Sequence, residues 1–171
     1  MCSSDLLLLV GHSFGALVAS TLAAPLEKMG RLAGLVLLSP SGLGEEVNRD
    51  FLLSVIEAAD DEALARALEA LTVKHYRSSA AYVRAMRARL LAAQAQLYRL
   101  VDDVVDIMGR QSRSIVETLA NLSAPVTLVH GREDTVISTA SRRLKKPKTK
   151  SSLSDRTQKT ATASVDRKSV V

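Results

Sequence analysis

Apolar positions along the chain alternate between short unbroken runs and helical spacing. Residues 6–10 and 32–38 are apolar runs interrupted only by small residues, a pattern typical of strands buried on both faces of a parallel sheet. Between them, residues 14–29 carry small and apolar side chains at helical spacing, and Gly30 follows as a helix stop. A strand, a helix and a strand in about thirty residues predict a right-handed βαβ unit with parallel strands.

The middle of the chain has a different pattern, with apolar residues three and four positions apart. Asp60 and Asp61, and Ser78 and Ser79, are natural caps between the segments. Residues 125–130 return to a strand pattern and end in a turn at 131–134. An all-helical insertion between two buried strands predicts a cap over a sheet, spanning about residues 45–119. Its predicted helices cover residues 51–59, 62–73, 80–97 and 101–108.

Periodicity stops after Ser138, where Ser, Thr, Lys and Arg dominate, so we expect residues 138–171 to be a disordered tail. The first and last few residues resemble translated adapter read-through, and we therefore expect the tail to be non-native. The tail also explains the net charge of +5, because residues 139–171 contain ten Lys and Arg against two Asp, which leaves −3 for residues 1–138. Since the tail has no aromatic residue for base stacking, we expect no nucleic-acid partner.

The amino-acid composition bears on disulfides, metal sites and membrane association. The single cysteine, Cys2, excludes an intrachain disulfide and a multi-cysteine metal site, and it fits a cytoplasmic protein. The longest early apolar stretch, residues 6–10, is far shorter than the ~20 residues that a membrane helix needs. We therefore expect no membrane association, no metal and no resident cofactor.

The candidate chemistry begins at Gly11-His-Ser-Phe-Gly15, which matches G-x-S-x-G between a predicted strand and a predicted helix. This context is that of a nucleophile elbow, in which Ser13 would attack a carbonyl and the backbone N–H of Phe14 would stabilise the oxyanion. The flanking glycines would leave room at the sharp turn. The alternative is that Ser13 only caps the following helix. His12 is too close in sequence to act as the base for Ser13, and we expect it to line the elbow.

Asp134 is the best candidate for the acid of a Ser-His-Asp triad, because it follows a buried strand after a short turn and comes after the serine in chain order. The alternative is an ordinary turn residue, since Asp is common in turns. We expect the neighbouring Glu133 to face the other way. The sequence has no histidine after His130, and neither His130 nor His75 occupies the place expected for the base. The triad histidine is therefore absent, and we expect this chain to be inactive as it stands.

Three segments together resemble the α/β-hydrolase fold family across residues 6–137: Leu9–Ala16, Leu35–Gly44 and Pro125–Asp134. The resemblance implies an incomplete α/β-hydrolase fold, a parallel sheet with a helical cap insertion. It also implies a serine acyl hydrolase or acyltransferase that acts on esters or thioesters of a small acyl substrate. The missing histidine leaves a second interpretation open, a non-enzymatic interaction or scaffold domain that keeps the fold.

A narrower resemblance concerns residues 41–51, which are similar to the hydrolase-like domain of the dihydrolipoyl acetyltransferase component of acetoin dehydrogenase complexes. It implies acetyl transfer linked to lipoate and coenzyme A, within a complex like those of 2-oxo-acid dehydrogenases. Arg84, Arg87 and Arg89 in the expected cap could contact an anionic ligand such as coenzyme A. A solvated helix face is the simpler interpretation of these three arginines.

Overall fold

The computed structural model describes residues 5–74, 76–131, 133–137 and 161–165, and the chain divides into two compact units. The first, the sheet unit, contains β1 (Leu7–His12), α1 (Phe14–Lys28), β2 (Leu32–Leu38), α6 (Val116–Asn121), β3 (Val126–Gly131) and β4 (Ala161–Val165). The second, the helical unit, contains residues 133–137 together with α2 (Arg49–Ile56), α3 (Asp61–Glu69), α4 (Ala80–Ala92) and α5 (Gln94–Val104). The expected insertion ended at about residue 119, whereas the long segment of the helical unit ends at Arg113.

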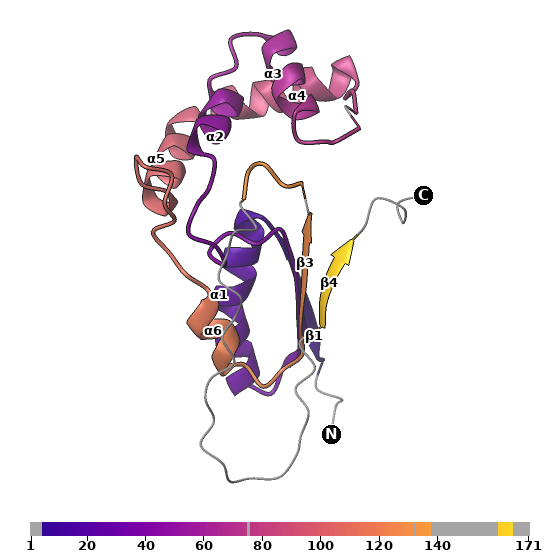
Figure 1. Ribbon diagram of the computed structural model, residues 1–171, viewed down its shortest axis with the longest axis vertical. Helices are drawn as coiled ribbons and strands as arrows, with labels where there is room; N and C mark the ends of the chain where they lie inside the picture. Colours follow the sequence, from indigo (N-terminus) through magenta and orange to yellow (C-terminus); the bar gives the residue numbers. More distant parts are fainter. Residues whose placement is uncertain (1–4, 75, 132, 138–160, 166–171) are drawn as a thin grey trace. The chain divides into compact units, whose positions relative to one another are not determined.

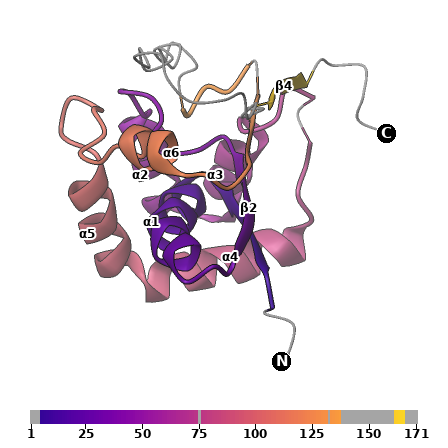
Figure 2. The same ribbon diagram turned by 90° about the horizontal axis from the view of Figure 1, so that it is seen from below.

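Among its described residues, the sheet unit has four strands in the order β1-β2-β3-β4, and each neighbouring pair is parallel. In the register, Val10 lies beside Val36 and Leu37 lies beside Leu128. Helices α1 and α6 lie on the same side of the strands (Figures 1 and 2). The prediction of an α/β fold with a parallel sheet is therefore confirmed.

The core of the sheet unit forms where α1 packs against β2. Ala16 and Ala23 of α1 and Leu37 of β2 are fully buried, and the small alanines let the helix axis approach the sheet closely. The buried Ser20 hydroxyl donates to the carbonyl oxygen of Ala16 at 2.8 Å, which satisfies it within the helix. Gly30 follows the helix with a φ of 66°, a conformation that glycine adopts without strain, so the predicted stop is confirmed.

Strand β1 is less buried than its sequence predicts. Leu6, Leu8 and Val10 are exposed by 60%, 61% and 61%, whereas Leu9 packs against the core. Alternate side chains of a strand point to opposite faces, and α1 covers only the face of Leu9. The expectation that this run is buried on both faces is therefore wrong for the residues that the structure describes.

The helices of the helical unit begin at side-chain caps. Asn48 accepts a hydrogen bond from the N–H of Phe51 at 2.9 Å, and Asp60 accepts one from the N–H of Ala63 at 2.7 Å. Ser79 caps α4 in the same way, so the predicted caps at Asp60 and Ser79 are confirmed. No helix in the described ranges combines the length and hydropathy needed to cross a membrane.

The predicted helix over residues 80–97 is wrong, because the chain breaks at Ala93 into α4 and α5. The break lets α4 pack against α3 while α5 packs against α2, and Gln94 Nε2 donates to the carbonyl oxygen of Ile56 at 3.1 Å. The predicted helix over residues 101–108 also differs, since α5 ends at Val104. Asp106 then closes a turn by accepting hydrogen bonds from the backbone N–H groups of Met108 and Arg110, both at 2.8 Å.

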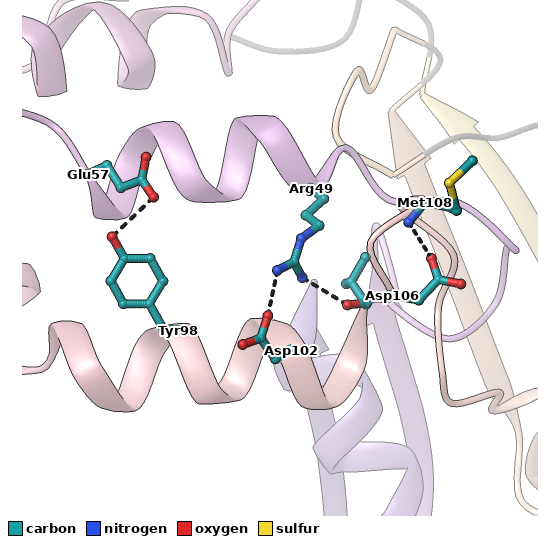
Figure 3. A network of polar contacts seen from close by, with 7 residues as sticks. Arg49, Glu57, Tyr98, Asp102, Asp106 and Met108 are labelled. Carbon is teal, nitrogen blue, oxygen red and sulfur yellow. Dashed lines mark hydrogen bonds and ion pairs between the residues drawn. The ribbon is translucent and has the colours of Figure 1, made fainter.

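A polar network joins α2 to α5 and to the turn that follows it (Figure 3). The Arg49 guanidinium pairs with Asp102 and donates to the carbonyl oxygen of Val105 at 2.9 Å. At the other end of α2, the Tyr98 hydroxyl donates to Glu57 at 3.1 Å. Burial, followed by the hydrogen bond and charge of Glu57, raises the pKa of the Tyr98 hydroxyl.

Helix α6 was not predicted from the sequence. The Ser114 hydroxyl accepts from the N–H of Val116 at 3.3 Å, and Ile115 and Leu122 are buried in the core of the sheet unit, with Leu119 packed against them. Apolar positions 115, 119 and 122 have helical spacing, but the helix is only six residues long. Such a short segment gives little periodicity to detect.

The structure also differs from expectation at residues 161–165, within the segment predicted to be disordered. These residues form β4, parallel to β3, with Leu128 beside Thr162 and Val129 beside Ala163. Thr and Val favour extended backbone, which suits a short strand at the edge of a sheet. The other residues of 138–171 lie outside the described ranges, so the prediction for them stays a prediction.

Candidate active site

Ser13 lies at the sharp turn between β1 and α1, with a φ of 52° and a ψ of −122°. A positive φ is unfavourable for a residue with a Cβ, and here the backbone is held in place by hydrogen bonds. The Ser13 N–H donates to the carbonyl oxygen of Leu38 at 2.9 Å, and the Ser13 carbonyl accepts from the N–H of Ala16 at 3.0 Å. The Ser13 hydroxyl makes no capping hydrogen bond to α1, which argues against the alternative that this side chain serves as a helix cap.

The two glycines of the motif play different roles. A Cβ at Gly11 would lie 2.5 Å from the carbonyl oxygen of Gly15 and 2.6 Å from the Cα of Ala16, so only glycine fits there. A Cβ at Gly15 would meet no described atom within 4 Å. The expectation that both glycines leave room at the turn is therefore confirmed for Gly11, whereas at Gly15 the described residues leave space for a side chain.

The N–H of Phe14 is in the position expected for an oxyanion donor. Phe14 is the first residue of α1, and the first N–H groups of a helix have no partner inside it. The helix dipole adds partial positive charge at this end. A negatively charged oxygen next to Ser13 would thus be stabilised by the start of α1.

The loop after β2 lies against the elbow. The Ser41 N–H donates to the carbonyl oxygen of Ser13 at 3.1 Å, and Pro40 is fully buried. Ser39 has a φ of 40°, and its N–H donates to the carbonyl oxygen of Val129 at 2.8 Å. Sequence reasoning missed Ser39, because the contacts that hold it come from strands far away in the sequence.

Asp134 belongs to the helical unit, whereas Ser13 belongs to the sheet unit. One carboxylate oxygen of Asp134 accepts hydrogen bonds from the N–H groups of Val136 and Ile137, both at 2.9 Å, so Asp134 organises its own turn. A carboxylate offers about four acceptor sites, and this structural role is compatible with a second one. Asp134 is half-buried and Glu133 is exposed.

The turn of Asp134 is held by the residues that lead into α2. The Asn48 N–H donates to the carbonyl oxygen of Val136 at 2.8 Å, and Asn48 Nδ2 lies 3.4 Å from the carbonyl oxygen of Thr135. Val47 pairs with Ile137 in an antiparallel bridge, and both side chains are buried in one small apolar cluster. Asn48 therefore links the first helix of its unit to the turn of Asp134.

The three histidines of the sequence are the candidates for the base of Ser13, and they lie on different parts of the chain. His12 is the last residue of β1 and is exposed, and His130 is half-buried on β3. His75 lies outside the described residues. Within the described part of the chain, no histidine is hydrogen-bonded to Ser13.

The three arginines of the expected helical cap, Arg84, Arg87 and Arg89, differ in contacts and in exposure. Arg87 donates to the carbonyl oxygen of Ala59 and lies 4.0 Å from a carboxylate oxygen of Asp61, so it holds α4 against the start of α3. Arg84 and Arg89 are exposed, as on a solvated helix face. Among the described residues, no three His, Cys, Asp or Glu side chains gather as the ligands of a metal ion would.

The family model for the alpha/beta hydrolase family matches residues 3–160 of this sequence. The chain belongs to the alpha/beta hydrolase family. The prediction from the serine motif and its flanking strands is thus confirmed at the level of family and fold. No curated protein matches the sequence.

Two of the similar solved structures illustrate the shared fold. The meta-cleavage product hydrolase from Pseudomonas fluorescens IP01 superposes with a TM-score of 0.60 at 19% identity, covering 81% of this chain and 51% of that one. An esterase from Rhodococcus sp. ECU1013 superposes with a TM-score of 0.52 at 22% identity, covering 78% of this chain and 50% of that one. This chain thus spans about half the length of both structures. At these identities the likeness shows the fold alone.

Proposed function

We propose that this hydrolase-family chain carries the nucleophile of a serine acyl hydrolase or acyltransferase that acts on esters or thioesters. The observation that carries the proposal is the conformation of Ser13. Its backbone is strained, with a φ of 52°, and its hydroxyl is not used to cap α1. Strain of this kind persists where the surrounding structure enforces it, and it is common at catalytic residues. The matched family and the esterase among the similar structures support the same reaction class.

The proposed reaction has two acyl-transfer steps. Ser13 Oγ attacks the acyl carbonyl carbon while a base removes its proton, and the resulting oxyanion accepts a hydrogen bond from the Phe14 N–H. The intermediate then collapses, breaking the bond to the leaving alkoxide or thiolate, which takes the proton from the base. Water, or an acceptor alcohol or thiol, then attacks the carbonyl carbon of the acylated serine while the base removes its proton. The second intermediate collapses, the bond to Ser13 Oγ breaks, and Ser13 Oγ takes the proton from the base.

In this proposal Asp134 orients the base and stabilises its protonated form. The assignment rests on the chain order of serine and acid and on the short turn that separates Asp134 from the end of β3. The base is not assigned, because the sequence contains no histidine after His130. We expect the acyl group to be small.

The narrower proposal is an acetyl transfer linked to lipoate and coenzyme A within a dehydrogenase-type complex. It rests only on the similarity of residues 41–51 to the acetoin-type acetyltransferase domain. Acetylation of Ser13 by acetyl-coenzyme A, followed by its transfer to dihydrolipoamide, would support it. Hydrolysis of simple esters without transfer to a thiol would instead favour a hydrolase.

The test of the general proposal uses the full 171-residue chain and supplies the missing base from solution. The chain is incubated with an alkyl fluorophosphonate in the presence and absence of imidazole, and the modified residue is found by mass spectrometry. We expect one adduct, on Ser13, that forms faster with imidazole because imidazole can take the hydroxyl proton. The Ser13→Ala variant should give no adduct, and Ser123→Ala, which removes an exposed serine of the same unit, should react like the unaltered chain.

Each outcome distinguishes the two functions that the sequence leaves open. Labelling of Ser13 that is accelerated by imidazole supports a serine nucleophile. If Ser13 reacts no faster than the exposed serines, the elbow does not activate it. The non-enzymatic scaffold interpretation then replaces the enzymatic one.

A further inference from the structure

Two serines with strained backbones stand side by side at the end of the sheet. Ser13 and Ser39 are the two residues other than glycine with a positive φ in the described part of the chain, at 52° and 40°. Each directly follows its strand, and the last paired residues of these strands, His12 and Leu38, are register partners. Neighbouring strands lie ~4.8 Å apart, so the two serines occupy adjacent positions at the same edge.

Ser39 is held rigidly in this position. Its N–H donates to the carbonyl oxygen of Val129 at 2.8 Å, which ties the loop to β3 on one side. Ser41 donates to the carbonyl oxygen of Ser13 at 3.1 Å, which ties the loop to the elbow on the other. Pro40, between them, is fully buried. The backbone that carries the Ser39 hydroxyl therefore has little freedom to lose when a ligand binds.

The side-chain hydroxyl is the group of Ser39 that could contact a ligand bound at Ser13. Ser39 is half-buried, and within the described residues its hydroxyl has no hydrogen-bond partner. A partly buried hydroxyl without a protein partner can be satisfied by a ligand, and a site that bonds a substrate in this way discriminates against analogues that lack the acceptor.

We propose that Ser39 is a specificity residue whose hydroxyl donates a hydrogen bond to an acceptor atom on the acyl group bound at Ser13. This inference rests on the proposed role of Ser13 as the nucleophile. It narrows the substrate class from acyl groups in general to acyl groups that carry an oxygen acceptor close to the reacting carbonyl. Purely hydrocarbon acyl groups would leave the hydroxyl unpaired and react more slowly.

The test compares fluorophosphonates of equal length in the full chain, with imidazole present. One probe carries an unbranched alkyl group, and the others replace one methylene at successive positions by an ether oxygen. The rate of Ser13 modification is followed by intact mass. We expect one ether probe to react about five to ten times faster than the alkyl probe, the range that a single hydrogen bond supplies.

Variants of the loop separate the hydroxyl from the backbone strain. Ser39→Ala and Ser39→Gly should both lose the ether preference, although Ser39→Gly also relieves the positive φ. Ser41→Ala is the matched control, because it removes the same side chain two residues further along the same loop and leaves the backbone hydrogen bond in place. It should keep the preference.

The outcomes separate this inference from the proposed function. If Ser13 is labelled but no ether probe is preferred, or if Ser39→Ala keeps the preference, the specificity role is overturned and the nucleophile stands. If no probe labels Ser13 faster than the exposed serines, the proposed function fails, and this inference fails with it.

Discussion

The two glycines of the serine motif should respond to alanine in opposite directions. At Gly11 the added Cβ would lie 2.5 Å from the carbonyl oxygen of Gly15 and 2.6 Å from the Cα of Ala16. Both are backbone atoms of the elbow, so relief requires the strand and the helix to separate. Overpacking of this kind costs about 3 kcal/mol. At Gly15, where nothing described lies within 4 Å, alanine gains about 0.5 kcal/mol because it favours helix.

Thermal unfolding followed by circular dichroism measures the difference. For a chain of this size, 1 kcal/mol corresponds to about 2–4 °C, so Gly11→Ala should lower the Tm by about 6–12 °C. Gly15→Ala should leave it unchanged or raise it by about 1–2 °C. Hydrogen exchange of the α1 amides would show that the loss lies in the sheet unit. An unchanged Tm for Gly11→Ala, or equal losses for both variants, would refute the close approach described at the elbow.

Three further predictions concern the rest of the chain. Asn48→Ala should speed hydrogen exchange of the amides of residues 135–137 more than Asp60→Ala. Both variants remove a cap worth about 1 kcal/mol, but Asn48→Ala also removes the side-chain contact to the Thr135 carbonyl oxygen. Leu37→Ala should cost about 2–5 kcal/mol in chemical denaturation and Leu8→Ala under about 1, since Leu37 is fully buried and Leu8 is 61% exposed. The carboxyl group of Asp106 should titrate below its ordinary pKa of 3.8 when it is followed by carboxyl carbon NMR. The turn at Asp106 should therefore loosen only as the pH falls through that lowered pKa. A titration at the ordinary pKa would contradict the hydrogen bonds to this carboxylate.

The pKa of Asp106 is lowered chiefly by the hydrogen bond from the backbone N–H of Arg110, with a further one from Met108. Because the folded pKa is depressed, this carboxylate stabilises the turn above the unfolded value and loses that contribution as the pH falls. The side chain is exposed to solvent, so the effect is local to residues 106–110. Asp106→Asn should abolish the titration and should raise amide exchange in the same turn.

The sequence predicted those parts of the fold that depend on local pattern. Strand β2 and the start of α1 match the prediction to the residue, because an unbroken apolar run and a glycine-bounded turn are local signals. The stop at Gly30 and the caps at Asp60 and Ser79 are local too. The break at Ala93 was missed, since the segment keeps helical spacing on both sides and only the packing of α5 against α2 requires the bend.

The candidate site shows the same division between local and distant causes. A motif of five residues was enough to place Ser13 at a strained turn, because the strand before it and the helix after it are both visible in the sequence. Ser39 is strained to a similar degree, yet no motif marks it, since its conformation is enforced by Val129 and by the elbow, which come from other parts of the chain. Asp134 lies between these cases: its turn is local, but Asn48, more than eighty residues earlier, holds the turn in place. A sequence pattern therefore identifies the residues that carry the proposed chemistry more readily than the residues that position them or select the substrate.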